Sequence, residues 1–239
     1  MDKRLIGEFM GTAMLILLGN GVVANVLLRK SKGEGAGWMV ITTGWGLAVM
    51  AGIFTAVLFG SADAHLNPAV TLGAAVSSGD YSKFLPYFAA QLAGGITGAA
   101  LVWLFYLPHW RETPDASAKL ACFCTSPAIR QPAANLLSEI IATFVLVLVG
   151  TSIAAKAAPT AGMGQYLWGC LVWGIGLSLG GTTGYAINPA RDLGPRIAHA
   201  LLPIAKKGDS DWSYAGIPIV GPLIGGALAG VVLKLLTNG

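Results

Sequence analysis

The sequence predicts an all-α membrane protein in which six transmembrane helices and two re-entrant half-helices form an inverted internal repeat. Its 239 residues are 54% hydrophobic and 11% charged, whereas soluble domains carry about 25% charged residues. Apolar segments recur along the whole chain, which argues against a secreted protein with one apolar signal peptide. The tripeptide Asn-Pro-Ala occurs at 67–69 and again at 188–190, each time at the start of a short apolar piece.

Six apolar segments are long enough to cross a membrane, for which a helix needs about 20 mainly apolar residues. Two further apolar pieces, 68–78 and 189–201, are too short. At about 1.5 Å per residue the first would extend roughly 16 Å, about half of a 30 Å hydrocarbon core. We therefore expect half-helices that enter the membrane and turn back. The full spans are expected at about 5–28, 37–59, 83–107, 134–155, 165–183 and 213–236.

Three landmarks occur in the same order in both halves of the chain. Glu-x-x-x-Thr begins at Glu8 and at Glu139, the Asn-Pro-Ala motif follows, and paired glycines come last, at 94–95 and 225–226. This order predicts a duplication. Each unit contains three full spans, an odd number, so the second must insert upside down. Inverted repeats with interrupted helices are typical of membrane proteins that have a solute pathway at the midplane.

The duplication also predicts the domain organisation. We expect a single domain over 1–239, because the two units are parts of one pathway. Its first repeat covers about 1–107, a polar linking loop covers about 108–132, and the second repeat covers about 133–239.

Each Asn-Pro-Ala motif predicts the first turn of a half-helix. Pro68 and Pro189 lack an N–H group and fit the first helical position. Asn67 and Asn188 then fall at the N-caps, where the side-chain oxygen accepts a backbone N–H and the carboxamide NH₂ is left free to point into a lumen. Two inverted half-helices would meet near the bilayer centre. Their N-termini, each with about half a positive charge, would repel cations there.

Arg191 is a candidate functional residue because an arginine within the membrane costs about 2.5–3.5 kcal/mol on insertion scales. We favour a guanidinium that faces the lumen, donates hydrogen bonds to solute oxygens and adds a barrier against cations. The alternative is a salt bridge with Asp192 or Glu139.

Together these motifs resemble the aquaporin and aquaglyceroporin (major intrinsic protein) family over nearly the whole chain. The resemblance rests on the two Asn-Pro-Ala boxes, on Glu8 and Glu139 in the first and fourth spans, and on Arg191 after the second box. It implies the aquaporin fold, one pore in each subunit of a homotetramer, and passive conduction without a cofactor or metal. It also implies a cell-membrane location with both termini in the cytoplasm. Glu8 and Glu139 would then be buried scaffold carboxylates that accept backbone N–H groups from the re-entrant loops.

Within this family, the constriction resembles that of the glycerol-conducting branch, which includes glycerol uptake facilitators. Alignment places Trp45, Gly176, Tyr185 and Arg191 at the constriction, and Asp192 directly follows the arginine. The resemblance implies an aromatic wall that receives the CH face of a polyol. Arg191 would bind its hydroxyl groups from the opposite side, Gly176 would supply width, and Asp192 would support this selectivity.

Two differences from the glycerol-conducting branch leave undissociated lactic acid as an alternative solute. Tyr185 stands where glycerol conductors commonly have Phe, and the segment between Trp45 and the first box is about two residues longer than in close relatives. The favoured solutes are glycerol and water, the alternative is undissociated lactic acid, and a water-selective channel is less favoured. His65 matches the inner mouth of the pore, where its ring could change protonation near neutral pH. Its alternatives are a structural histidine or one whose carbonyl alone lines the pore.

Other functions lack support in the sequence. An intramembrane enzyme would need a nucleophile–base pair or a metal triad, and neither is visible. The net charge of +4 is scattered, which gives no nucleic-acid patch. A scaffold protein would need a long interaction tail, yet the chain starts at the first span and ends three residues after Leu236. The expected partners are therefore small neutral solutes, the lipid bilayer and further copies of the chain.

The distribution of Lys and Arg opposes the expected orientation. Cytoplasmic loops usually carry the excess of these residues. With cytoplasmic termini, five lie inside and nine outside, Arg191 set aside. We keep the expected orientation because Lys3 and Arg4 precede the first span to insert. The inner set is Lys3, Arg4, Lys83, Lys156 and Lys234; the outer set is Arg29, Lys30, Lys32, Arg111, Lys119, Arg130, Arg196, Lys206 and Lys207.

Overall fold

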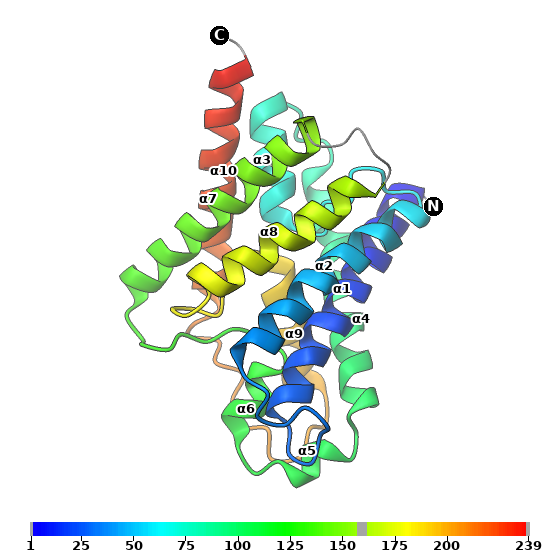
Figure 1. Ribbon diagram of the computed structural model, residues 1–239, viewed down its shortest axis with the longest axis vertical. Helices are drawn as coiled ribbons and strands as arrows, with labels where there is room; N and C mark the ends of the chain where they lie inside the picture. The colour runs from blue at the N-terminus through cyan, green and yellow to red at the C-terminus, as the bar shows by residue number, and fades with distance from the viewer. Residues whose placement is uncertain (1, 157–161, 238–239) are drawn as a thin grey trace.

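The computed structural model describes residues 2–156 and 162–237, and this part of the chain is built from helices without any strand (Figure 1). Both termini lie in the upper half of that view, and the linking loop with its two short helices lies at the lower end. We call these the termini side and the loop side. The helices are α1 (Lys3–Leu27), α2 (Trp38–Leu58), α3 (Pro68–Ser78), α4 (Phe84–Phe105), α5 (His109–Glu112), α6 (Ala116–Ala121), α7 (Pro132–Lys156), α8 (Met163–Leu179), α9 (Pro189–Leu201) and α10 (Gly216–Thr237).

The six predicted spans correspond to α1, α2, α4, α7, α8 and α10, and the half-helices are α3 and α9. Within the described residues, five helices are long and apolar enough to cross a membrane by length and composition. The sixth, α8, has 17 residues, or about 26 Å. Its predicted end at 183 is wrong: the helix ends at Leu179, and Gly180 and Gly181 lead into a turn.

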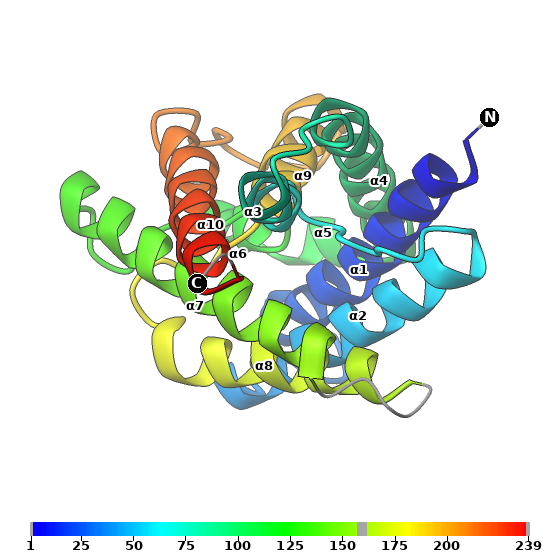
Figure 2. The ribbon, with the colours of Figure 1, turned by 90° about the horizontal axis from the view of Figure 1, so that it is seen from above.

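The two half-helices lie next to each other between α10 and α4 (Figure 2). In the first half α1 packs on α2 and α4, and in the second half α7 packs on α8 and α10. Each half-helix also crosses to the other half, because α3 packs on α10 and α9 packs on α4. This paired arrangement agrees with the duplicated landmarks, while the repeat boundaries stay a prediction.

Glycines allow the closest of these crossings. A Cβ atom on Gly94 would lie against the backbone carbonyl of Phe9 in α1, and a Cβ on Gly225 would lie against that of Ile140 in α7. Small residues let membrane helices approach to backbone contact. The matched glycines therefore hold α4 against α1 and α10 against α7.

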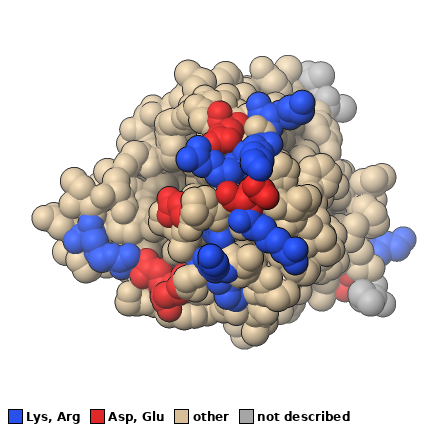
Figure 3. Space-filling model, turned by 90° about the horizontal axis from the view of Figure 1, so that it is seen from below, with Lys and Arg blue, Asp and Glu red and all other residues tan. Residues whose placement is uncertain are grey.

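Most cations on the loop side take part in the fold of the loops. Figure 3 shows Lys and Arg intermixed with Asp and Glu on this face. Lys207 donates to the carbonyls of His199, Ala200 and Leu202 at 2.6–2.8 Å, where a cation offsets the negative C-terminal end of α9. Further cations form ion pairs: Arg29 with Glu34, Lys30 with Glu112 and Arg130 with Asp211, at 2.5–2.6 Å. These contacts account for part of the positive charge that the sequence places on this side.

Candidate pore and solute-binding site

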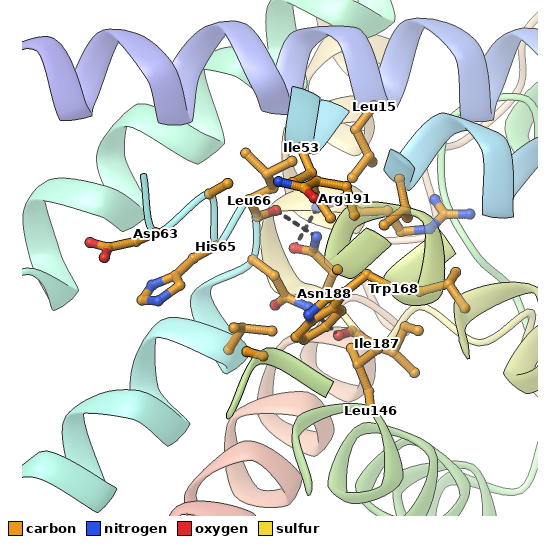
Figure 4. Close-up of a pocket in the computed structure, with 18 of the residues that line it drawn as sticks. Leu15, Ile53, Asp63, His65, Leu66, Leu146, Trp168, Ile187, Asn188 and Arg191 are labelled. Atoms are coloured by element: carbon orange, nitrogen blue, oxygen red, sulfur yellow. Dashed lines mark hydrogen bonds between the residues drawn. The ribbon is translucent and has the colours of Figure 1, made fainter. Parts of the chain in front are cut away.

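A cavity of about 520 Å³ runs along the middle of the molecule, between the two re-entrant loops (Figure 4). Its lining is mainly apolar, with side chains such as Leu15, Ile53 and Leu146. Of the seven residues predicted to line a pore, six line this cavity: Trp45, His65, Asn67, Tyr185, Asn188 and Arg191. Gly176 is not among the residues that line this cavity, so its position at the constriction stays a prediction.

The two Asn-Pro-Ala motifs cap the half-helices. Asn67 Oδ1 accepts the N–H of Ala69 at 2.9 Å, and Asn188 Oδ1 accepts that of Ala190 at 3.0 Å. Pro68 and Pro189 are the first helical residues. Both predicted N-caps are therefore confirmed.

The prediction that each carboxamide NH₂ is free needs correction. Asn67 Nδ2 donates to the carbonyl of Ile187, and Asn188 Nδ2 donates to that of Leu66, both at 2.8 Å. Figure 4 shows Leu66 and Asn188 together at the centre of the site. An NH₂ group has two hydrogens, so each asparagine keeps one donor for a solute. The other donor ties the two half-helices together, a link between residues about 120 positions apart.

The loop before each half-helix has a strained backbone. Leu66 and Ile187 have φ angles of +52° and +44°, and Ala64 and Tyr185 have +43° and +39°. Residues other than glycine seldom adopt the left-handed region, and for β-branched Ile187 it is an outlier. Such strain persists only where contacts from the surrounding structure hold the backbone in this conformation.

In the first half of the chain, Glu8 holds the strained loop in place through hydrogen bonds. Its carboxylate is fully buried and accepts four hydrogen bonds. Oε1 accepts from Ser61 Oγ at 2.7 Å and His65 N at 2.9 Å. Oε2 accepts from Leu66 N and Gln91 Nε2, both at 2.8 Å. The carboxylate therefore satisfies backbone groups of the strained loop that would otherwise be buried without partners.

Glu139 does the same in the second half. Its fully buried carboxylate accepts from Thr183 Oγ1 at 2.6 Å, Ala186 N at 2.9 Å and Ile187 N at 2.8 Å. The matched positions of Glu8 and Glu139 in the sequence correspond to matched positions beside the two loops. Sequence reasoning missed their side-chain donors Ser61, Gln91 and Thr183.

Arg191 lies against Trp45 rather than across the pore from it. The guanidinium Cζ is 4.0 Å from the centre of the indole ring, a cation–π contact. Carbon atoms at van der Waals contact are about 3.5–4.0 Å apart, so no solute fits between the two. The expectation that they form opposite walls is therefore wrong: they form one surface with an apolar part and a donor part.

The guanidinium retains unused hydrogen-bonding capacity. Arg191 is only 8% exposed, and its buried Nη1 has no hydrogen-bond partner in the part of the chain that the structure describes. None of the ion pairs found among the described residues includes Arg191, so the alternative of a salt bridge with Asp192 or Glu139 is not observed.

Asp192 is part of the scaffold on the loop side and lies outside the cavity lining. Its Oδ2 accepts from Thr125 N at 2.8 Å and Thr125 Oγ1 at 2.7 Å, and its Oδ1 accepts from Arg196 Nε at 2.8 Å. Arg196 in turn donates to the carbonyls of Thr125 and Ser210. Asp192 thus joins the linking loop to α9, and its support of selectivity stays a prediction.

Tyr185 is buried, with its hydroxyl group near Gly176. The phenol is 4% exposed, and its hydroxyl has no hydrogen-bond partner among the described residues. A Cβ on Gly176 would lie 2.8 Å from Tyr185 Cζ and 2.9 Å from Oη. Gly176 therefore makes room for the tyrosine from behind and so affects the width of the pore only through Tyr185.

Trp38 supports the same tyrosine and was missed by sequence reasoning. Its ring meets Tyr185 edge-on, with centroids 5.9 Å apart, and its Nε1 donates to the carbonyl of Gly176 at 3.1 Å. Trp38 precedes Trp45 by seven residues, about two helical turns, so both lie on one face of α2. That spacing is the signal that could have identified it.

Replacing Trp38 by Phe should keep the ring contact and remove the donor to Gly176. One neutral hydrogen bond is worth about 1 kcal/mol, so we expect the Tm of the purified protein to fall by roughly 2–4 °C. Trp212→Phe is the control, because Trp212 is an exposed loop residue. An equal Tm change in both variants would contradict a role for this bond.

Comparison with known proteins agrees with this geometry. The family model described as Major intrinsic protein matches residues 1–233. The chain is 56% identical to "Glycerol uptake facilitator protein 3" of Lactiplantibacillus plantarum over 98% of this chain and 96% of that protein. It is 57% identical to "Probable glycerol uptake facilitator protein" of Thermotoga maritima over 93% of this chain and 94% of that protein.

One further relative and one solved structure are similar to this chain. A "D/L-lactic acid transporter" of Lactiplantibacillus plantarum is 39% identical over 96% of this chain and 95% of that protein. The X-ray structure of the aquaglyceroporin from Plasmodium falciparum is similar, with a TM-score of 0.85 and 29% identity over 98% of this chain and 96% of that chain. The fold, the paired half-helices and the match over residues 1–233 show that this chain belongs to the major intrinsic protein family.

Proposed function

We propose that this protein is a passive channel that conducts glycerol and water across the cell membrane and excludes ions and protons. Relatives at 56–57% identity over almost the whole chain carry the name glycerol uptake facilitator, which supports glycerol as the solute. Large apolar side chains are exposed on the outside of the helices, which supports a multi-pass membrane protein surrounded by lipid. Examples are Leu58, Leu85, Phe105 and Leu235, each more than 70% exposed.

The observation that carries the proposal is the surface formed by Trp45, Tyr185 and Arg191. It combines an indole with the Arg191 guanidinium, whose Nη1 has no hydrogen-bond partner among the described residues. Buried polar groups are normally hydrogen-bonded, so a solute that brings hydroxyl groups and a CH face into the cavity complements this surface. Glycerol has both.

Ion exclusion follows from the charges around the same cavity. The N-terminal ends of α3 and α9 meet at Asn67 and Asn188, and each carries about half a positive charge. Arg191 adds a full one. A cation would meet this positive field while losing its hydration shell, and a carboxylate bound tightly by Arg191 would leave slowly. Neutral solutes avoid both costs.

Membership in the family supports transport rather than catalysis. We propose a homotetramer with one pore in each subunit, two inverted repeats over about 1–107 and 133–239, and both termini in the cytoplasm. Labelling of single cysteines placed at Asp80 and at Lys32 with a membrane-impermeant reagent tests the orientation, since the two lie on opposite sides. Reaction of position 80 in intact cells would contradict it.

Undissociated lactic acid is the second candidate solute. The 39% identical relative is named a D/L-lactic acid transporter. The lower identity places this candidate behind glycerol. A water-selective channel is less favoured than either.

Uptake into proteoliposomes tests these assignments. We expect glycerol and water permeability well above that of empty vesicles, and a lactic acid rate below that of glycerol at every pH. Water flux without any gain in glycerol permeability would contradict the proposal. Lactic acid entry that follows the undissociated fraction and exceeds glycerol entry would favour the second candidate.

A further inference from the structure

A second polar site lies at the other end of the cavity from Arg191. Asp63 and His65 line the cavity from the loop between α2 and α3, and Figure 4 shows their side chains side by side at one end of the pocket. Asp63 is bonded to Lys83, which directly precedes α4. This places the pair at the mouth on the termini side.

Asp63 keeps one carboxylate oxygen available. Both of its side-chain hydrogen bonds use Oδ2, which accepts from Lys83 Nζ at 2.6 Å and Tyr87 Oη at 2.8 Å. The structure describes no bond to Oδ1. Burial acts to raise the pKa of the Asp63 carboxyl, but the hydrogen bonds from Lys83 and Tyr87 outweigh it and hold that pKa below its ordinary value. The carboxylate is therefore ionised at neutral pH and Oδ1 is a strong acceptor.

His65 offers a second acceptor, because its proton position follows from its neighbours. The Thr71 hydroxyl donates its single hydrogen to the carbonyl of Asn67 at 3.1 Å. His65 Nδ1 lies 3.1 Å from the same hydroxyl oxygen, so the ring nitrogen must be the donor. A neutral histidine protonated on Nδ1 has a lone pair on Nε2. No partner for Nε2 is found among the described residues.

The two ends of the cavity thus differ in kind. The loop-side end holds the Arg191 guanidinium, which can only donate hydrogen bonds. The termini-side mouth holds Asp63 Oδ1 and His65 Nε2, which accept them. A carboxylate could accept hydrogen bonds at the Arg191 end but could not donate at the Asp63 end, and an ammonium group could do only the reverse. A hydroxyl group both accepts and donates, so a polyol can form hydrogen bonds at each end as it passes.

We propose that Asp63 and His65 form a second solute-binding site at the termini-side mouth, one that accepts hydrogen bonds from the adjacent hydroxyl groups of a polyol. This inference rests on the proposed function as a glycerol channel. Lys83 is part of the site, since its charge offsets that of Asp63 and limits the attraction of free cations.

The test measures how glycerol blocks water flow. Water flux through proteoliposomes is driven by an impermeant osmolyte, with equal glycerol concentrations on both sides. Glycerol bound in the pore obstructs the water file, so the concentration that halves channel water flux reports its affinity. We expect this concentration to rise about three- to tenfold in Asp63→Ala, the loss of one charge-assisted hydrogen bond at an accessible site. A smaller rise is expected in Asp63→Asn.

The matched control is Asp80→Ala. Asp80 is an exposed carboxylate between α3 and α4 that accepts a hydrogen bond from Ser82 N at 2.9 Å and lies outside the cavity lining. The glycerol concentration that halves water flux should therefore be the same in Asp80→Ala as in the wild type. Dimethyl sulfoxide, a small neutral solute that has no hydrogen-bond donor, should affect water flux equally in all variants. Water flux without glycerol reports that each variant is folded.

Two results would overturn the inference. One is an unchanged glycerol concentration for half-maximal block in both Asp63 variants, and the other is an equal shift for glycerol and dimethyl sulfoxide, which would indicate a changed pore width. A wild-type protein that does not pass glycerol would instead contradict the proposed function. The two failures are therefore distinguishable.

Discussion

Replacing Glu139 by leucine is expected to destabilise the protein by at least about 3 kcal/mol and to abolish channel activity. The substitution removes every acceptor for Thr183 Oγ1, Ala186 N and Ile187 N. Each buried donor left without a partner costs roughly 1–3 kcal/mol. Ile187 would also lose the contact that holds its φ of +44°. Its carbonyl accepts from Asn67, so the central link between the half-helices would break as well.

Graded variants separate the loss of these bonds from general damage to the fold. Glu139→Gln keeps one acceptor oxygen in nearly the same shape, so its Tm should lie between those of the wild type and Glu139→Leu. Glu8→Leu should resemble Glu139→Leu, because four donors lose their acceptor there. Thermal unfolding in detergent and water flux are the measurements. A Glu139→Leu protein with wild-type Tm and water flux would contradict the scaffold role.

The half-helices are the part of the fold that the sequence predicts best. Both begin and end at the predicted residues, 68–78 and 189–201. The reason is local: proline defines the first residue of each, and α3 ends at Gly79, whose φ of +81° suits glycine. Apolar residues alone do not show where a span stops, so the apolar pattern continues to 183 although α8 ends at Leu179 and a turn begins at Gly180.

The interior of the site could be predicted only in outline. Sequence patterns identify Asn67, Asn188 and Arg191 as important, since each is unusual in an apolar chain. They do not show that the asparagines donate to Leu66 and Ile187. Such contacts depend on rotamers and on residues more than a hundred positions apart, which periodicity along one helix does not report. The same limit explains why the contact between Arg191 and Trp45 is not apparent from the sequence.

Replacing Gly176 by alanine is expected to lower glycerol permeability about tenfold or more while lowering water permeability much less. The new Cβ would lie 2.8 Å from Tyr185 Cζ, 2.9 Å from its Oη and 3.0 Å from Thr42 Cγ2. Contacts below 3.0 Å force something to move, and overpacking of this kind typically costs about 1–3 kcal/mol. A tenfold change in rate corresponds to about 1.4 kcal/mol in the barrier.

The tyrosine can yield only toward the cavity. Trp38 meets its ring edge-on, and a Cβ on Gly180 would also collide with its Cδ1, so α2 and α8 block the other directions. Tyr185 lines the cavity beside Arg191 and Trp45. Displacement of Tyr185 would narrow the pore where glycerol, the larger solute, must pass. Selectivity by size depends on pore diameter. Water, being smaller, should lose less.

Two further variants make this prediction specific. Gly174→Ala is the matched control in α8, because a Cβ there meets no atom within 4 Å, and it should leave both permeabilities unchanged. Gly176→Ala combined with Tyr185→Leu removes the colliding phenol tip and should restore much of the glycerol rate. Alanine favours helix more than glycine does, so a loss of α8 would not explain a glycerol-specific effect. If glycerol and water permeability fell equally in Gly176→Ala, or if the double variant gave no recovery, then Gly176 would not control pore width through Tyr185.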